Sequence, residues 1–347
     1  MKVVVDDKIP YIREALAGMG VEAIYLPGSK INHDSVCDAD ALIVRTRTQC
    51  NATLLAGTRV QFIATATIGY DHIDTAYCEA QGIRWTNAPG CNAASVCQYI
   101  QSVLLLLHLE RGMELNKATI GVVGVGHVGT LVVEMARKWG MRVLQCDPPR
   151  ADRGEQGFVT LDTIAHEADV ITLHTPLIRG GAHSTFHLAD DTFFRSLRRK
   201  PYFINTSRGE ATDTQALKRA LDEGRIAQCV IDVWENEPEI DLDLLGRCYV
   251  GTPHIAGYSA DGKANATRMA LSALAKHFGL GEVPPINPPS PTNSCVQADS
   301  RACALLQIYN PHTDSRKLKS HPECFEQLRG DYPLRREEQA YSLVIED

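Results

Sequence analysis

Three segments in the second half of the chain carry residue types suited to hydride transfer from an alcohol. Asn205 to Gly209 includes Arg208, a second segment contains Glu237, and a third contains His254. Oxidation of an alcohol needs a base for the hydroxyl proton while hydride leaves the carbon, and imidazole titrates near neutral pH. A carboxylate on the far ring nitrogen fixes the tautomer and stabilises the imidazolium. We therefore expect Glu237 and His254 to form an acid–base pair.

Arg208 is the candidate for binding an anionic substrate. A guanidinium at the carboxyl end of a strand can hold a carboxylate through two parallel hydrogen bonds. An isolated Arg-Gly in a turn is more often a surface arginine, and any one of the 12 histidines is more often structural. The catalytic interpretation depends on all three residues following predicted strands. It predicts a dehydrogenase for a small anionic 2-hydroxy acid.

A cofactor site is indicated by the run Gly124-Val125-Gly126-His127-Val128-Gly129, which fits G-x-G-x-x-G. The run follows an apolar strand and opens a helical segment, as dinucleotide binding requires. Gly124 allows the tight turn, Gly126 lets the pyrophosphate approach the backbone, and Gly129 lets helix and strand pack closely. The N–H groups at the start of the helix then face the phosphates.

Asp147 follows the next predicted strand, where a carboxylate can accept hydrogen bonds from the ribose hydroxyls and repel a 2′-phosphate. This position favours NAD over NADP. Arg150 and Arg153 lie close enough in sequence to keep NADP open as an alternative.

The order of predicted elements indicates an α/β protein. Strands are expected at Lys2–Asp6, Ala41–Val44 and Phe62–Thr67 in a first parallel sheet, with helices between them. A long helix near 93–112 leads into a second unit. Its strands are expected at Thr119–Val123, Arg142–Cys146, Val170–His174, Tyr202–Thr206, Gln228–Val233 and Cys248–Gly251. Six strands with helical crossovers predict a Rossmann-type doubly wound sheet.

Bulk composition excludes several classes of partner. The net charge is −7 and the hydrophobic content is 44%, as in a soluble globular protein, so neither nucleic acid nor a membrane is expected as a partner. No signal-peptide pattern starts the chain, and the 11 cysteines include no Cys-x-x-Cys pair. We expect a cytoplasmic protein with free thiols and no metal site.

The segments above resemble the D-isomer-specific 2-hydroxyacid dehydrogenases over roughly residues 1–281. The markers are the glycine run with Asp147, His174 to Leu177, Asn205 to Gly209, Asp232 to Pro238, and Pro253-His254. The resemblance implies NAD as cofactor and a catalytic role for Arg208, Glu237 and His254. It places the NAD-binding positions on Gly124, Gly126, His127, Val128, Gly129, Asp147, Thr175, Thr206, Ser207, Asp232 and Gly257.

Within the family, the similarity is greatest to members that act on a phosphorylated 2-hydroxy acid and carry an added C-terminal dimerisation domain. The doubled proline after Asp147 is the most specific marker of that group. The resemblance implies substrate contacts at Arg45, Thr46, Thr67 and Tyr258, although the group usually has Ser at the position of Thr46. Arg45 and Arg47 could equally be solvated surface charges.

The domain organisation expected from this resemblance has three parts. A flavodoxin-like substrate-binding domain would comprise 1–93 and 256–281, and an NAD-binding Rossmann domain 94–255. The Pro-rich stretch from Val283 and the polar tail would make 282–347 a linker and small dimerisation region, giving a homodimer.

Two rival functions remain open at this point. A sister enzyme acting on 3-phosphoglycerate or another 2-hydroxy acid would share the hydride chemistry and differ in its pocket. A non-catalytic NAD-sensing protein would share the fold but would need neither the acid–base pair nor the arginine.

Overall fold

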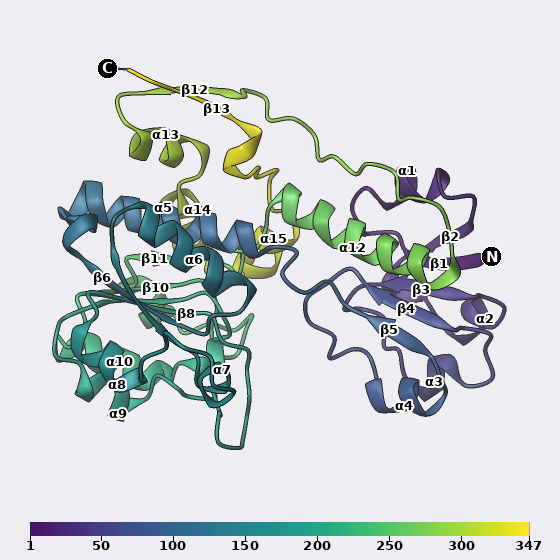
Figure 1. Cartoon of the computed structure of the whole chain (residues 1–347), viewed down its shortest axis with the longest axis horizontal. Coiled ribbons are helices and arrows are strands. Elements are labelled where there is room, and N and C mark those ends of the chain that lie inside the picture. Colours follow the sequence, from purple (N-terminus) through teal and green to yellow (C-terminus); the bar gives the residue numbers. More distant parts are fainter. Residues whose placement is uncertain (347) are drawn as a thin grey trace. The chain divides into compact units, whose positions relative to one another are not determined.

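The computed structural model describes residues 1–346, and they form two compact units (Figure 1). The first unit comprises Met1–Asn92 together with Ser259–Ser290, so the chain enters it twice. The second comprises Ala93–Tyr258 together with the C-terminal segment that begins at Pro291. Each unit is built around its own parallel sheet.

The first unit contains a five-stranded parallel sheet in the order β2-β1-β3-β4-β5. This is the flavodoxin-like order, as expected. The strands are β1 (Lys2–Asp6), β2 (Glu22–Leu26), β3 (Ala41–Val44), β4 (Phe62–Thr65) and β5 (Arg84–Thr86). The central strands β1, β3 and β4 are continuous apolar runs because helices cover both faces of the sheet.

Separate hydrophobic clusters lie on the two faces of this sheet. One face packs on α1 (Ile12–Ala17) and on α12 (Ala260–Phe278), which returns to this unit late in the sequence. The other face packs on α2 (His33–Val36), α3 (Ala52–Leu55) and α4 (Thr75–Ala80). With both faces covered, the carboxyl ends of the strands remain as the place where loops carry polar side chains.

The second unit contains a six-stranded parallel sheet in the order β11-β10-β9-β8-β6-β7. Its strands are β6 (Thr119–Val123), β7 (Arg142–Cys146), β8 (Val170–Leu173), β9 (Tyr202–Asn205), β10 (Gln228–Ile231) and β11 (Val250–Gly251). β6 pairs with β7 on one side and with β8 on the other, so the strand order reverses at β6. Open α/β sheets bind ligands outside the carboxyl ends of their strands at such a reversal.

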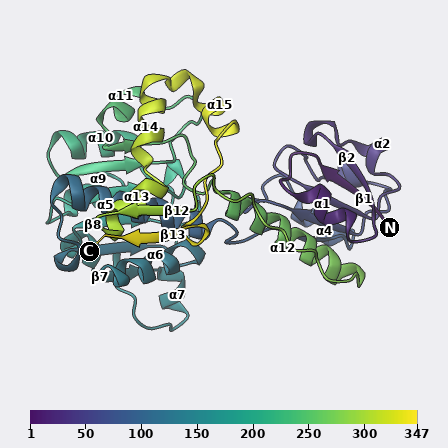
Figure 2. The ribbon, with the colours of Figure 1, turned by 90° about the horizontal axis from the view of Figure 1, so that it is seen from above.

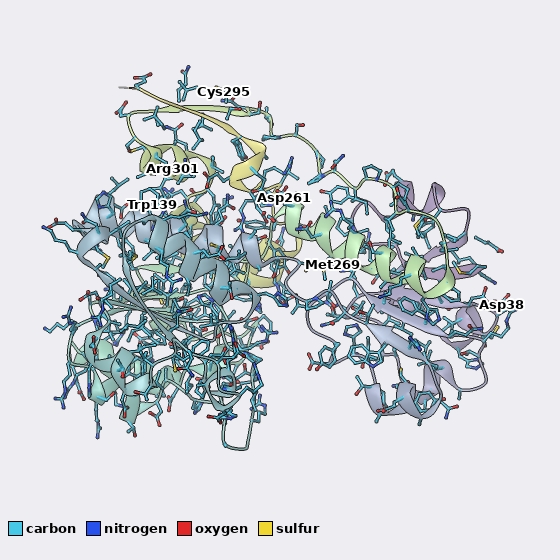
Figure 3. The ribbon with its side chains drawn as sticks, in the orientation of Figure 1. Asp38, Trp139, Asp261, Met269, Cys295 and Arg301 are labelled. Carbon is cyan, nitrogen blue, oxygen red and sulfur yellow. The ribbon has the colours of Figure 1, made fainter. Side chains whose placement is uncertain are left out.

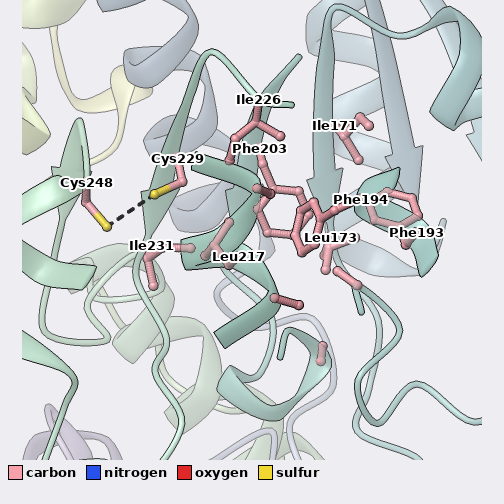
Figure 4. Close-up of a cluster of buried hydrophobic side chains, with 14 of the residues drawn as sticks. Ile171, Leu173, Phe193, Phe194, Phe203, Leu217, Ile226, Cys229, Ile231 and Cys248 are labelled. Carbon is pink, nitrogen blue, oxygen red and sulfur yellow. Dashed lines mark hydrogen bonds between the residues drawn. The ribbon is translucent and has the colours of Figure 1, made fainter. Parts of the chain in front are cut away.

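Helices cover both faces of the second sheet and confirm the doubly wound prediction. One face carries α5 (Ala93–Arg111) and α6 (His127–Lys138). The other packs on α8 (Leu161–Glu167), α9 (Asp191–Ser196), α10 (Thr214–Asp222) and α11 (Leu242–Arg247). Figure 4 shows part of this second core, in which the rings of Phe194 and Phe203 meet edge to face and the Cys229 and Cys248 thiols lie 3.4 Å apart.

Most predicted strands are confirmed, but their carboxyl ends are shorter than expected. β8, β9 and β10 stop one or two residues early, at Leu173, Asn205 and Ile231, because the backbone there turns into loops held by side-chain hydrogen bonds. β2 and β5 were not predicted. Both are edge strands with partly exposed side chains and therefore lack a continuous apolar run.

The C-terminal segment is ordered and packs on the second unit (Figure 2). It contains β12 (Cys295–Ala298), α13 (Arg301–Ile308), α14 (Pro311–Ser320), α15 (Phe325–Gly330) and β13 (Ser342–Ile345). α13 packs on α5, and α14 packs on β11, where the Gly251 N–H donates to Ser315 Oγ at 3.0 Å. β12 and β13 form a separate two-stranded parallel sheet.

A cavity of about 390 Å³ lies between α5, α6 and this segment, with Trp139 and Arg301 among its lining residues (Figure 3). None of the predicted site residues lines it. Among residues 1–346, no helix is both long enough and apolar enough to cross a bilayer, and all the cysteines are free thiols.

Candidate active site

The glycine run forms a tight turn between β6 and α6, in which Gly124 and Gly129 leave no room for a side chain and Gly126 faces open space. Gly124 has φ +86°, and a Cβ there would lie 2.8 Å from the His174 carbonyl group. A Cβ at Gly129 would lie 2.0 Å from the Gly124 oxygen, so only glycine lets the helix approach the turn. A Cβ at Gly126 would meet no described atom within 4 Å. The backbone at Gly126 is therefore open to a ligand at the start of α6, where helical N–H groups attract phosphate.

Two buried hydroxyls at the carboxyl ends of β8 and β9 support a ligand in the same place. Thr175 Oγ1 and Thr206 Oγ1 are shielded from solvent and have no hydrogen-bond partner within residues 1–346. Buried polar atoms are nearly always paired in native proteins, so two orphaned hydroxyls at this edge of the sheet are available to hydrogen-bond a ligand. Both residues are among the positions predicted to contact NAD, and these residues fit the cofactor.

Asp147 links the glycine turn to the short helix α7 (Pro148–Asp152). Its Oδ2 accepts a hydrogen bond from the Val125 N–H at 2.8 Å, and its Oδ1 caps α7 by accepting from the Arg150 N–H at 3.2 Å. The carboxylate thus lies directly beside the turn, at the end of β7. A negative charge here disfavours a 2′-phosphate, which agrees with NAD as cofactor.

Arg150 and Arg153, which left NADP as an alternative cofactor, both form ion pairs within the protein. The Arg150 guanidinium donates to the Val125 carbonyl at 2.6 Å and lies 2.6 Å from Glu155 Oε2. Arg153 lies 3.1 Å from the other oxygen of Glu155. Both guanidinium groups are therefore already directed at Glu155, which weakens the case for a 2′-phosphate site built from these two arginines.

Glu237 and His254 form the predicted pair. His254 Nδ1 lies 2.8 Å from Glu237 Oε2, while Glu237 Oε1 accepts a hydrogen bond from the Trp234 N–H at 2.9 Å. Both side chains are less than one-third exposed. With Nδ1 bonded to the carboxylate, the tautomer leaves Nε2 as the nitrogen that can accept a proton.

The charge on Glu237 is favoured by its neighbours. Burial opposes ionisation, but the hydrogen bond and positive field of His254, the Trp234 N–H and the Arg329 guanidinium more than offset it. As a result, the pKa of the Glu237 carboxyl lies below its usual value. An ionised carboxylate at neutral pH is what stabilises an imidazolium on the partner.

Asp232 holds the loop that carries His254. Its Oδ1 accepts from the Thr252 hydroxyl at 2.6 Å and from the Ile255 N–H at 2.8 Å, and its Oδ2 accepts from the Ala256 N–H at 2.9 Å. His254 itself has φ +56°, an unfavourable backbone conformation for a residue with a Cβ. The Asp232 bonds on either side stabilise this conformation. Burial nevertheless raises the pKa of Asp232.

Arg208 lies in a loop that is fastened at its base by Asn205. The Asn205 amide donates to the Arg208 carbonyl at 2.9 Å, and its oxygen accepts from both the N–H and the hydroxyl of Ser207. Arg208 is exposed, and among the described residues its guanidinium has no carboxylate partner; it donates to the Ser207 carbonyl at 2.7 Å. It therefore remains able to bind an anion.

Gly209 brings the arginine loop against the loop of the acid. A Cβ at Gly209 would lie 2.0 Å from the Trp234 oxygen and 2.5 Å from the Glu235 nitrogen. The absent side chain lets the loop after β9 lie directly on the backbone that leads to Glu237. Arg208, Glu237 and His254 are thus carried by three loops at the carboxyl ends of neighbouring strands, β9, β10 and β11.

The remaining predicted NAD and substrate positions of the second unit differ in how far their polar groups are already used within the protein. His127 and Val128 form the first turn of α6, and Gly257 and Tyr258 follow the His254 loop. The Ser207 hydroxyl is already bonded to Asn205, and both Asp232 oxygens are used within the protein. These two residues hold the loops at this edge of the sheet.

The predicted substrate residues of the first unit lie at the carboxyl ends of β3 and β4. Arg45 is half-buried, with one guanidinium nitrogen 3.2 Å from the Lys8 carbonyl, and Thr46 and Arg47 are exposed. No carboxylate among the described residues forms an ion pair with Lys8, Arg45 or Arg47. Lys8, which follows β1, was missed because a single lysine has no sequence signature.

Thr67 is held in a short chain of hydrogen bonds within the first unit. Its hydroxyl donates to the Gly69 carbonyl at 2.8 Å and lies 2.6 Å from the Thr65 hydroxyl, which in turn lies 3.0 Å from His72 Nε2. His72 is buried, and burial lowers the pKa of its imidazole. A neutral imidazole thus contacts the Thr65 hydroxyl, which in turn contacts the Thr67 hydroxyl.

Sequence reasoning also missed two arginines of the C-terminal segment. Arg329 in α15 donates through Nε to the Tyr258 hydroxyl at 3.0 Å and has a second nitrogen 4.0 Å from Glu237 Oε2. Arg335 is buried and donates to the Ala256 carbonyl at 2.6 Å. The segment is polar and far away in sequence, so only the tertiary structure reveals that it contacts the His254 loop.

Comparison with known proteins agrees with this arrangement. Residues 107–256 match the family described as D-isomer specific 2-hydroxyacid dehydrogenase, NAD binding domain. The chain is 56% identical to erythronate-4-phosphate dehydrogenase of Bacteroides thetaiotaomicron over 345 residues, covering 99% of both chains. It is 58% identical to the Bacteroides fragilis enzyme of the same name over 346 residues, again covering 99% of both.

A solved structure of the wider family has the same architecture. D-lactate dehydrogenase from Aquifex aeolicus, complexed with NAD and lactic acid, matches with a TM-score of 0.62 and 27% identity, covering 80% of this chain and 96% of that one. The glycine turn, Asp147 and the two orphaned threonine hydroxyls fit an NAD-dependent enzyme. The chain therefore belongs to the D-isomer-specific 2-hydroxyacid dehydrogenase family and, within it, to the erythronate-4-phosphate dehydrogenases.

Proposed function

We propose that this protein oxidises 4-phospho-D-erythronate at C2 to (R)-3-hydroxy-2-oxo-4-phosphooxybutanoate with NAD, in a route to pyridoxal 5′-phosphate. The observation that carries the proposal is the 2.8 Å contact of His254 Nδ1 with Glu237 Oε2 at the same sheet edge as the glycine turn. The near full-length similarity to enzymes named for this substrate supports the choice of acid.

His254 is the base in this scheme. Its Nε2 takes the proton of the C2 hydroxyl as the C2–H bond breaks and the C2–O bond becomes a carbonyl. Glu237 keeps the accepting nitrogen in the required tautomer and stabilises the imidazolium that results. In the reverse direction, the same imidazolium returns its proton to the carbonyl oxygen.

Arg208 binds the C1 carboxylate of the substrate. An exposed guanidinium without a carboxylate partner can form two parallel hydrogen bonds to that group and so hold the substrate in one orientation. Gly209 keeps the Arg208 loop against the backbone before Glu237. The arginine that binds the carboxylate and the pair that holds the base therefore keep fixed relative positions.

A bound NAD would supply the hydride acceptor for C2. The residues that would hold its pyrophosphate are Gly124, Gly126, His127, Val128 and Gly129, with the open backbone at Gly126 as the point of closest approach. Asp147 would take the adenosine ribose. Thr175, Thr206, Ser207, Asp232 and Gly257 complete the binding edge, and the Thr175 and Thr206 hydroxyls gain the partners they lack.

The phosphate of the substrate is assigned to Arg45, Thr46 and Thr67 of the first unit. Tyr258 of the second unit is assigned separately as a substrate-binding residue. Arg45, Arg47 and Lys8 provide positive charge at the ends of β1 and β3 that no ion pair compensates in the described residues. A phosphate dianion is the ligand that such a set binds best.

We also infer that the enzyme works as a cytoplasmic homodimer joined through the C-terminal segment. A two-stranded sheet is rarely stable by itself, and β13 exposes Val344 and Ile345. A second copy of this sheet would extend or cover it and bury part of this apolar surface.

Initial rates of NADH formation on a panel of acids test the substrate assignment. The panel is 4-phospho-D-erythronate, D-erythronate, 3-phospho-D-glycerate and D-lactate, each with NAD and with NADP. We expect the highest kcat/KM for 4-phospho-D-erythronate with NAD, at least about 100-fold above D-erythronate, because the phosphate contributes charge-assisted hydrogen bonds.

Two other outcomes of this panel would each support one of the alternative functions. A higher kcat/KM for 3-phospho-D-glycerate would assign the protein to a sister activity. NAD binding without turnover of any acid would support a non-catalytic NAD sensor and contradict the proposal.

A further inference from the structure

The C-terminal helix α15 brings a second guanidinium to the catalytic pair. Arg329 Nε donates to the Tyr258 hydroxyl at 3.0 Å, which fixes the orientation of the guanidinium plane. In that orientation Nη1 lies 4.0 Å from Glu237 Oε2. This is the same carboxylate oxygen that lies 2.8 Å from His254 Nδ1.

The position of Arg329 makes its charge effective at the pair. Its side chain is 30% exposed and that of Glu237 is 18% exposed, so water screens the interaction only partly. The other carboxylate near Arg329 is Glu326, at 3.9 Å, and its side chain is 57% exposed. Of the two carboxylates near Arg329, Glu237 is the less exposed, so water screens its interaction with the guanidinium less.

We propose that Arg329 is a positioning residue that weakens the affinity of His254 for protons and so keeps the imidazole free to act as a base. The inference depends on the proposed role of His254. A guanidinium beside Glu237 offsets part of the negative charge that stabilises the imidazolium, and it repels the imidazolium directly.

The other charged and titratable groups around His254 are carried by several elements. Glu237 and Asp232 follow β10, and both favour the protonated ring. Arg208 follows β9 on the adjacent loop. From the C-terminal segment, Arg335 binds the Ile255 and Ala256 carbonyls, and Tyr332 packs edge to face on Tyr258. Of the cations in this segment, Arg329 is the one that contacts the carboxylate of the pair.

The pH dependence of kcat/KM at saturating NAD tests this assignment. Arg329→Met keeps a long unbranched side chain, and Arg329→Gln keeps a hydrogen-bond donor, but both remove the charge. We expect each to move the acid limb to higher pH by roughly 0.5 to 1 unit. The alkaline limb of the reverse reduction should move by the same amount in the same direction, since one imidazole governs both limbs.

Arg329→Lys and Arg316→Gln are the matched controls. Lysine retains the charge, so its acid limb should stay within roughly 0.3 unit of the wild-type limb. Arg316 lies on α14, where it contacts Thr313 of the same helix, and its loss should leave the profile in place. The NMR titration of His254 in the apoprotein gives a second readout that does not depend on turnover.

An unchanged acid limb in folded Arg329→Met or Arg329→Gln would overturn the inference and leave the proposed function intact. So would an equal shift in Arg329→Lys, because the effect would then not come from charge. A purely structural role predicts a uniform loss of kcat at every pH. If His254→Gln turned over normally, the proposed function itself would fail, which is a distinguishable result.

Discussion

Single carboxylates in this site each perform two tasks. Glu237 accepts a backbone N–H with one oxygen and His254 with the other, and Asp147 ties the glycine turn to the start of α7. Asp232 uses both oxygens to hold the loop of the base. Because each acid is fixed by backbone donors, its free lone pairs point in a defined direction before any ligand arrives.

Substitution of Gly126 by Ala separates cofactor binding from folding. The new Cβ meets no described protein atom within 4 Å, so the melting temperature should stay within about 2 °C of wild type. The methyl group would occupy the approach path of the pyrophosphate, and the KM for NAD should rise roughly 10- to 100-fold. Steady-state kinetics and thermal unfolding measure the two effects.

Gly129→Ala is the contrasting variant. Its Cβ would lie 2.0 Å from the Gly124 oxygen, so we expect a loss of stability of about 1–3 kcal/mol. If Gly126→Ala unfolded as easily as Gly129→Ala, the open backbone would not be a ligand site.

The burial of His72 predicts that the stability of the folded protein depends on pH. Burial lowers the pKa of its imidazole in the folded protein, so the unfolded chain takes up a proton at higher pH than the folded one. The contribution is therefore complete above about pH 6.5 and is lost as the pH falls below that value. In urea unfolding, wild type should lose up to about 1 kcal/mol more than His72→Gln between pH 7 and pH 5.5.

Wild type and His72→Gln are unfolded in the same buffers, so that the difference between their pH dependences reports His72 alone. Equal pH dependence in wild type and His72→Gln would show that His72 does not titrate with folding.

At the scale of elements, the site depends on loops that lie on one another at the ends of parallel strands. Gly209→Ala should force the Arg208 loop away from the Trp234 backbone, where its Cβ would lie 2.0 Å from an oxygen. We expect kcat/KM to fall roughly 10- to 100-fold because Arg208 would no longer hold the substrate in the correct position relative to His254. Initial rates on the substrate measure this loss.

Gly246→Ala is the control for Gly209→Ala. Gly246 lies in α11, and a Cβ there would meet no described atom within 4 Å. Alanine favours helix over glycine, so this variant should be as active and as stable as wild type or slightly more stable. Full activity in Gly209→Ala would mean that the two loops need not touch.

The elements differ in how well the sequence predicts them. Buried parallel strands such as β6 and β8 are continuous apolar runs, and the glycine run and Asp147 have fixed spacing, so both are predictable from local sequence. The edge strand β5 is half exposed and has no such pattern. The Arg329–Glu237 contact joins segments far apart in the chain, and no local periodicity encodes it.

At the scale of the whole molecule, the C-terminal segment contacts the proposed active site of its own chain. α13 and α14 pack on the second unit, and Arg329 and Arg335 contact residues that follow His254. Removal of this segment should therefore affect catalysis as well as assembly, and substitutions on its exposed surface are the cleaner test of the dimer.

The paired substitution Val344→Lys with Ile345→Lys tests assembly through β13. Both side chains are at least 40% exposed, so the change should leave the fold of the chain intact. We expect wild type to sediment as a dimer and the variant to dissociate at micromolar concentration, because buried lysines oppose the contact. A dimer of unchanged stability would place the interface on another surface.

The central claim is that His254, oriented by Glu237, removes the substrate proton during hydride transfer. The most direct test is the single-turnover rate of NADH formation in His254→Gln with NAD already bound, after NAD affinity has been shown to match wild type. We predict a rate roughly 10²- to 10⁴-fold below wild type. A rate within a factor of two of wild type, at equal NAD occupancy, would contradict the account.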